Sequence, residues 1–153
     1  MARILLATDG SPSAGKAVEE AVRLTRATGW PLTIVTAWHL PATGFAYDPL
    51  VAVPEAIDAV RDSARDVLAK AAATARSAGI EPDTELLEGA PADQICKLAE
   101  RCGATLVVLG SHGWGPVHRL LFGSVSAAVL HHAPCPVLVV RHGGDDPAAE
   151  RAG

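Results

Sequence analysis

The sequence predicts an α/β fold, in which an open, five-stranded parallel sheet carries helices on both faces. Short apolar runs alternate along the chain with longer segments whose apolar residues recur at helical spacing. The run from Thr105 to Leu109 is apolar after its first residue, which is typical of a central strand buried on both faces. Strands that alternate with helices in this way form parallel sheets with right-handed crossovers.

The first strand and the first helix lie near the amino terminus. Arg3–Thr8 is a short apolar run, which predicts a buried strand. A turn containing Gly, Ser and Pro follows, and either Ser11 or Ser13 is expected to cap a helix over Ala14–Thr28. Gly29 is the expected residue just past the end of that helix.

The middle of the chain predicts two further strands with a long helix between them. Leu32–Trp38 is rich in β-branched residues and predicts the second strand. Residues 39–53 contain prolines, a glycine and aromatic residues, and indicate an irregular loop. Pro54 suits the first turn of a helix that ends near Gly79, and Asp83–Leu87 follows as a weaker strand.

The remaining elements complete the alternation. Pro91 opens a helix that reaches Cys102, and the strand at 105–109 follows it. A glycine-rich loop then leads to a short helix over Ser124–His132 and to a last strand over Val137–Val140. Ligands of such open sheets bind beyond the carboxyl ends of the strands, so the loops after the first, second and fourth strands are the candidates for a site.

Composition and charge disfavour several classes of protein. The 153 residues, 49% of them hydrophobic, fit one globular domain, which we expect over residues 1–141 with a polar tail over 142–153. The formal net charge of −4 disfavours nucleic acid and anionic membranes as partners. No apolar run approaches the roughly 18 residues of a membrane helix. The three cysteines, without a signal peptide, favour a reducing cytoplasm.

The loop after the fourth strand carries the predicted chemistry. Gly110 and Gly113 lack side chains, so a ligand can approach their amide groups, which can form a site for an anion. Gly123 and Ser124 open a helix whose first amides are unpaired and whose positive dipole end favours phosphate. The hydroxyls of Ser124 and Ser126 can add hydrogen bonds. A plain turn is the alternative interpretation of the same residues.

The spacing G-x2-G-x9-G-S, which runs from Gly110 to Ser124, resembles the nucleotide-binding signature of the universal stress protein family. The resemblance extends to the opening segment Ile4–Ser11 and to the closing segment His132–Arg141, and so covers nearly the whole chain. It points to the branch of the family that binds ATP. Trp114 stands where the family often has Arg, and Arg119, alone or with His118, could supply the missing charge.

The resemblance implies the sheet order 3-2-1-4-5 of the Rossmann-like, adenine nucleotide α-hydrolase-like fold. It implies ATP, alone or with Mg²⁺ or Mn²⁺, as ligand, with adenine near the end of the second strand. It also implies a homodimer formed through Val137–Val140. Asp9 either contacts the nucleotide or caps the turn at Gly10. The expected nucleotide-binding residues are Ala7, Thr8, Asp9, Val35, Ala37, Leu109, Gly110, Gly113, Arg119, Gly123, Ser124, Val125 and Ser126.

Three functions are compatible with these features. The first is a regulatory ATP-binding protein of the stress response, in which phosphate orders the glycine-rich loop and alters binding to an unidentified protein partner. The second is a slow ATPase or nucleotide hydrolase, which needs a positioned water and stabilisation of the transition-state charge. The third is an interaction module that works without nucleotide. The intact glycine signature favours the first, with ADP and cyclic nucleotides as alternative ligands.

Overall fold

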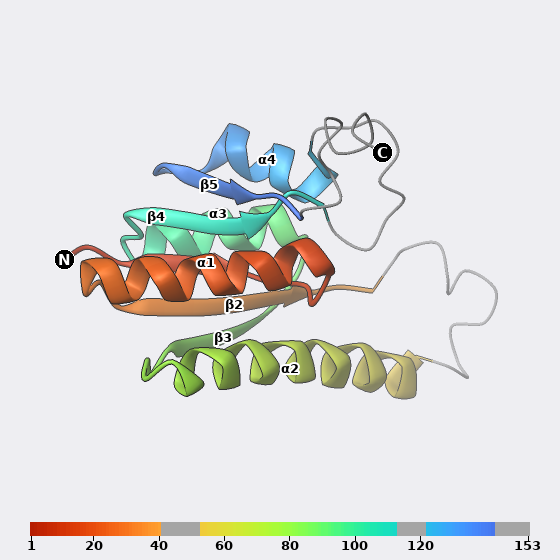
Figure 1. Ribbon diagram of the computed structural model, residues 1–153. Helices are drawn as coiled ribbons and strands as arrows, with labels where there is room; N and C mark the ends of the chain where they lie inside the picture. Colours follow the sequence, from red (N-terminus) through yellow and green to blue (C-terminus); the bar gives the residue numbers. More distant parts are fainter. Residues whose placement is uncertain (41–52, 113–121, 143–153) are drawn as a thin grey trace, which may run out of the picture.

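The computed structural model describes residues 1–40, 53–112 and 122–142. Within these ranges, strands and helices alternate along the chain (Figure 1). The elements are β1 (Ile4–Ala7), α1 (Pro12–Thr28), β2 (Leu32–Trp38), α2 (Val53–Ser77), β3 (Asp83–Glu88), α3 (Pro91–Arg101), β4 (Leu106–Gly110), α4 (Ser124–His132) and β5 (Val137–Val140).

The strands form one parallel sheet of five strands in the order β3-β2-β1-β4-β5, which confirms the predicted fold class. The register pairs Ile4 with Leu32 on one side and with Leu106 on the other. The chain builds outward from β1 to β3 and then returns to the other side of β1 with β4. The strand order therefore reverses between β1 and β4, and a ligand site is expected beyond their carboxyl ends.

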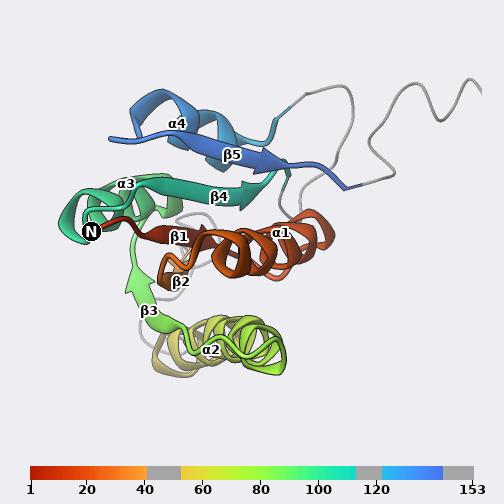
Figure 2. The ribbon, with the colours of Figure 1, turned by 60° about the vertical axis from the view of Figure 1, so that its left-hand side comes forward.

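Helices cover both faces of the sheet, as predicted (Figures 1 and 2). Side chains alternate between the two faces along each strand, so Ile4 and Leu6 pack under α1 and α2. Leu5 and Ala7 point to the opposite face and pack with residues of α3 and α4. Each face thus has its own apolar core, with β1 buried between them.

The ends of α1 follow the predicted capping pattern, although the helix begins earlier than expected. Ser11 is the amino-terminal cap, and its Oγ accepts the N–H of Ala14 at 3.4 Å. Pro12 occupies the first helical position, where a missing N–H costs nothing. Gly29 has a φ of 72° and donates its N–H to the carbonyl of Thr25, as expected of a left-handed terminating residue.

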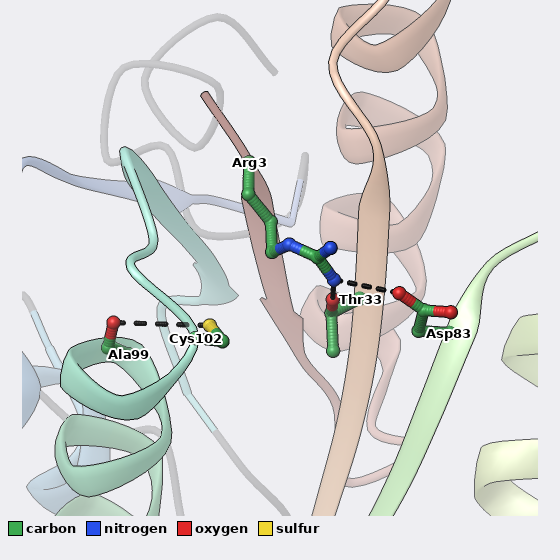
Figure 3. Close-up of polar contacts among 5 residues, drawn as sticks. All are labelled: Arg3, Thr33, Asp83, Ala99 and Cys102. Carbon is green, nitrogen blue, oxygen red and sulfur yellow. Dashed lines mark hydrogen bonds and ion pairs between the residues drawn. The ribbon is translucent and has the colours of Figure 1, made fainter. Parts of the chain in front are cut away.

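Arg3 ties the amino edge of the sheet together (Figure 3). Its guanidinium donates to Thr33 Oγ1 and to Asp83 Oδ2, both at 2.7 Å, and so reaches across β2 to β3. Its backbone N–H donates to Thr105 Oγ1 at 3.2 Å, and its carbonyl accepts the N–H of Thr105 at 2.9 Å. These bonds place Thr105 before β4, which begins at Leu106, one residue later than predicted.

The three cysteines are unpaired and half-buried against the core under α3 and α4. Figure 3 shows Cys102 at the end of α3, where its Sγ lies 3.9 Å from the carbonyl oxygen of Ala99. Burial raises the pKa of the Cys96 thiol, and Asp93 and Cys135 raise it further. Burial also raises the pKa of Cys135. Thiols with raised pKa values are weak nucleophiles, which agrees with a packing role.

Candidate functional site

A pocket of about 480 Å³ opens beyond the carboxyl ends of β1, β2 and β4. It lies where the strand order reverses, which is the position expected for a ligand in this type of sheet. Its walls come from these strands and from the first turns of α1, α3 and α4. The lining residues are Ala7, Thr8, Asp9, Ala14, Val35, Ala37, Pro91, Ile95, Leu109, Gly110, His112, Phe122, Gly123, Ser124, Val125 and Ser126.

The deep part of the pocket is apolar. Ala7, Val35 and Leu109 come from three neighbouring strands and are nearly inaccessible to solvent in the folded chain. Ile95 reaches them from α3 and is equally buried. Pockets for small molecules combine such an apolar wall with a few well-placed polar groups. This wall is suited to the flat face of an aromatic ring.

The turn between β1 and α1 borders the pocket and is held by hydrogen bonds between residues two apart in sequence. Asp9 Oδ1 accepts the N–H of Ser11 at 2.9 Å, so this carboxylate caps the turn. Thr8 Oγ1 accepts the N–H of Gly10 at 3.3 Å. Gly10 has a φ of 78°, and a Cβ there would lie 2.9 Å from Val67 Cγ2 of α2. Asp9 also lines the pocket, so the capping role does not remove it from the site.

The residues that follow β4 are hydrogen-bonded to the start of α1. The carbonyl of His112 accepts hydrogen bonds from Ser11 Oγ, at 3.2 Å, and from Ser13 Oγ. The N–H of His112 donates to Ser13 Oγ at 3.2 Å. Both serines are buried. Two segments about a hundred residues apart in sequence are thus held together at the edge of the pocket.

Gly110 has a packing role that the sequence analysis did not predict. The sequence suggested that its missing side chain lets a ligand approach the backbone. In the structure that space holds the start of α1, because a Cβ on Gly110 would lie 2.6 Å from the backbone N of Ala14 and from the backbone C of Ser13. The glycine therefore allows β4 and α1 to pack closely, although Gly110 also lines the pocket.

The first turn of α4 forms the polar side of the pocket. Gly123 is its amino-terminal cap, makes no side-chain capping bond, and donates its own N–H to the carbonyl of Ser111 at 2.6 Å. The early amides of a helix have no partner within the helix, so those of Ser124 and Val125 can face a ligand. The hydroxyl of Ser126, for which a hydrogen bond to the ligand was predicted, donates to the carbonyl of Ser111 at 2.8 Å; the residue is buried and lines the pocket.

The structure brings together along this pocket every predicted site residue that lies within the described ranges. Gly113 and Arg119, together with Trp114, fall outside those ranges. Ala14, Pro91, Ile95, His112 and Phe122 also line the pocket and were not predicted. Pro91 and Ile95 could have been predicted from the sequence, because the turn after β3 lies at the same edge of the sheet as the loops after β1, β2 and β4.

Two titratable residues, Asp9 and His112, are found among the described residues that line the pocket. The described part of the chain contains no group of three His, Cys, Asp or Glu side chains placed to hold a metal ion. None of its helices is both long enough and apolar enough to cross a bilayer.

Trp38, at the end of β2, is not among the residues that line the pocket. The centroid of its ring instead lies 5.4 Å from the guanidinium carbon of Arg61 in α2.

The comparison with known protein families identifies the family of the chain. The model of the universal stress protein family matches residues 1–141. The chain belongs to this family. Universal stress protein YxiE of Bacillus subtilis is 33% identical over 147 residues, which cover 91% of this chain and 98% of the relative.

Solved universal stress proteins share the architecture. UspA from Lactobacillus plantarum has a TM-score of 0.78 at 28% identity, over 92% of this chain and 97% of that one. A universal stress protein in complex with cAMP has a TM-score of 0.69 at 28% identity, with the same coverage. The protein from Archaeoglobus fulgidus in complex with dAMP has a TM-score of 0.67 at 27% identity, over 92% and 98%. The last two hold adenine nucleotides.

Proposed function

We propose that this universal stress protein binds an adenine nucleotide, and specifically ATP, in the pocket at the carboxyl edge of the sheet. The observation that carries the proposal is the combination of an apolar wall with the first turn of α4 in one pocket of about 480 Å³. The related structures that contain cAMP and dAMP support adenine as the base.

Each part of the pocket suits one part of the nucleotide. The adenine ring would lie against Val35, Ala37 and Ile95, which offer an apolar surface. The phosphates would lie at the first amides of α4, because the positive end of a helix dipole and its unpaired N–H groups favour anions. A Mg²⁺ or Mn²⁺ ion would arrive with ATP, with phosphate oxygens and water among its ligands, as is usual for Mg²⁺.

Thermal unfolding of nucleotide-free protein, with and without millimolar ATP and Mg²⁺, tests the proposal. A ligand at about 100 times its Kd stabilises the folded state by about 2.7 kcal/mol. This raises Tm by several degrees in a domain of this size. The absence of any increase would contradict nucleotide binding.

A matched pair of glycine variants tests the site. Gly123→Val places a branched side chain at the phosphate end of the pocket, and the backbone there, with φ −72° and ψ 170°, is accessible to valine. This variant should fold and lose the ATP-dependent increase in Tm. Gly15→Val is the control, because a Cβ on Gly15 meets nothing within 4 Å and Gly15 does not line this pocket. Equal increases in both variants would refute the assignment.

The structure gives more support to binding than to rapid catalysis. Asp9 is the one carboxylate among the described lining residues, and its Oδ1 accepts the N–H of Ser11. We propose that ATP acts as a regulatory ligand that alters binding to a protein partner. Phosphate release, followed at a protein concentration far below that of ATP, separates this function from slow hydrolysis. Steady release would favour the hydrolase.

We further propose that the protein is a cytoplasmic homodimer that pairs through β5. β5 is the outermost strand on its side of the sheet, so one side of its backbone is unpaired within the described chain. All four of its residues are half-buried in the single chain. The three unpaired cysteines agree with a reducing compartment. Light scattering that gives the mass of a single chain would contradict the dimer.

A further inference from the structure

Ser13 is a buried polar residue whose role is not explained by the capping of α1. Either Ser11 or Ser13 was expected to be the cap, and the structure gives that role to Ser11. Ser13 is 4% exposed and does not line the pocket. A buried hydroxyl requires hydrogen-bond partners, and Ser13 finds them 99 residues away in the sequence.

The hydroxyl of Ser13 contacts both backbone polar groups of one residue. It donates to the carbonyl of His112 and accepts the N–H of His112 at 3.2 Å. A serine hydroxyl can do both, because it carries one donor and two acceptor positions. Ser11 Oγ donates to the same carbonyl at 3.2 Å, whereas the N–H is held by Ser13. These bonds fix the backbone where the chain leaves β4.

The contact of Ser13 depends on the close approach of α1 to β4 at Gly110. A Cβ at Gly110 would lie 2.6 Å from Ser13 Oγ, so a larger residue there would displace the hydroxyl. Because Gly110 has no side chain, the short side chain of Ser13 reaches the backbone just beyond the strand.

The residue before His112 holds the first turn of α4. The carbonyl of Ser111 accepts the N–H of Gly123 at 2.6 Å and the hydroxyl of Ser126 at 2.8 Å. The N–H of Ser111 donates to the carbonyl of Val140 at 2.9 Å, which ties the same residue to β5. Ser111 and His112 therefore form a junction, at which the starts of α1 and α4 are bonded to one short piece of backbone.

The junction connects two walls of the pocket. One wall is the turn before α1, which carries Asp9, and the other is the first turn of α4, where we place the phosphates. Amides bind an anion only when they are held within hydrogen-bonding distance of it. A site that is ordered before the ligand arrives does not lose affinity to ordering. Ser13 is thus placed to affect phosphate binding without touching the ligand.

We propose that Ser13 is a positioning residue, which holds the first turn of α4 in place for the phosphates and so favours nucleotides over nucleosides. The inference rests on the proposed nucleotide function. The apolar wall formed by Val35, Ala37 and Ile95 is not part of the junction. Binding of the base should therefore not depend on Ser13.

Calorimetry with ATP and with adenosine tests the inference on the unchanged protein and on Ser13→Ala. The variant keeps the bond from Ser11 to the carbonyl of His112 but removes the acceptor of the His112 N–H. ATP should bind the variant roughly fivefold to tenfold more weakly, which corresponds to about one buried hydrogen bond. The affinities of the two proteins for adenosine should agree within about twofold.

Gly29→Ala is the control, because it strains the other end of α1. Gly29 has a φ of 72°, which alanine adopts poorly, and a Cβ there meets nothing within 4 Å. This variant should lose stability and keep its affinity for both ligands.

Three results would overturn the inference. The first is equal ATP affinity of the unchanged protein and Ser13→Ala. The second is an equal loss of affinity for ATP and adenosine in Ser13→Ala, since Ser13 would then shape the whole pocket. The third is a loss of ATP affinity in Gly29→Ala as large as in Ser13→Ala, since stability alone would then explain both. Failure of the unchanged protein to bind ATP would overturn the proposed function, and the inference with it.

A second measurement needs no variant. Hydrogen exchange, followed by NMR for single amides of the unchanged protein, compares the N–H of His112, which is bonded to Ser13, with that of Gly29 at the other end of α1. ATP should slow exchange at His112 more than at Gly29, because a ligand that requires the junction stabilises its bonds. Adenosine should not. If ATP slowed exchange at His112 no more than at Gly29, the inference would be overturned even if Ser13→Ala failed to fold.

Discussion

The two edges of the sheet at which the parallel strands begin and end, the amino edge and the carboxyl edge, are held together by different kinds of side chain. At the carboxyl edge, short serine side chains bond to the backbone of neighbouring segments, as Ser13 does to His112 and Ser126 does to Ser111. At the amino edge, the long side chain of Arg3 spans from β1 to Asp83 of β3 (Figure 3). Serines join segments without filling the space above the strands, and the pocket of about 480 Å³ lies there.

This difference predicts how substitutions at each edge act. A change at the amino edge should alter stability and leave ligand affinity unchanged, because the pocket lies at the opposite ends of the strands. A change at the carboxyl edge can alter affinity, stability or both, according to whether the residue faces the pocket or the neighbouring segment. Three substitutions examine this comparison.

Gly110→Ala should have the largest effect, and that effect should be on folding. The added Cβ would lie 2.6 Å from backbone atoms of Ser13 and Ala14, which cannot move aside as the end of a side chain can. We expect the free energy of unfolding to fall by about 3 kcal/mol, as for overpacking in a close-packed region. Urea unfolding measures the change.

Gly15→Ala is the matched control for this variant. Gly15 lies within α1, and a Cβ there meets nothing within 4 Å. Alanine should therefore stabilise the protein by about 1 kcal/mol through its higher helix propensity. If Gly110→Ala cost less than about 0.5 kcal/mol, the start of α1 would be able to shift, and the carboxyl edge would be less rigid than proposed.

Ser126→Ala should have an intermediate effect on both stability and affinity. The change removes the donor to the carbonyl of Ser111, at 2.8 Å, in a buried position. We expect a loss of about 1–2 kcal/mol in the free energy of unfolding. ATP affinity should also fall, because the bond fixes the first turn of α4 against β4. Urea unfolding and calorimetry measure the two effects.

Ser77→Ala provides the comparison for Ser126→Ala. Ser77 Oγ donates to the carbonyl of Ala73 at 2.9 Å, but the residue is exposed, so water can replace the bond. Its loss should change stability by less than about 0.5 kcal/mol. Equal effects of the two substitutions would show that the buried bond of Ser126 adds nothing to the carboxyl edge.

The sequence was sufficient to predict the elements and much of the pocket. The bounds of β2, α4 and β5 match the predicted ranges residue for residue. These elements are delimited by proline, glycine and changes in apolar periodicity, all of which are local signals. Ala7, Val35 and Leu109 line the pocket because they lie near the carboxyl ends of strands, and this follows from the strand order.

Other features depend on contacts between segments distant in sequence. Nothing near Gly110 indicates that α1 fills the space beside it. The bond from Ser126 to Ser111 likewise depends on how α4 meets β4. Ile95 is buried on the core-facing side of α3, but the same face also borders the pocket. Periodicity identifies a buried face without indicating whether protein or ligand covers it.

Arg3→Ala should have the smallest effect of the three substitutions, and it should be confined to stability. The pair with Asp83 is partly exposed, with relative side-chain exposures of 29% for Arg3 and 68% for Asp83, so solvent weakens the attraction. The bond to Thr33 adds to it, since Thr33 is buried. We expect a loss of about 1 kcal/mol by urea unfolding, with ATP affinity unchanged by calorimetry.

Arg76→Ala separates the role of Arg3 from that of an ordinary surface pair. Arg76 pairs with Glu81 at 2.9 Å, and both side chains are at least half exposed. Its loss should change stability by less than about 0.5 kcal/mol. If Arg3→Ala weakened ATP binding while Arg76→Ala did not, the amino edge would be coupled to the pocket through the strands. The two edges could then no longer be treated as independent, because a change in strand alignment at one edge would move the residues that line the other.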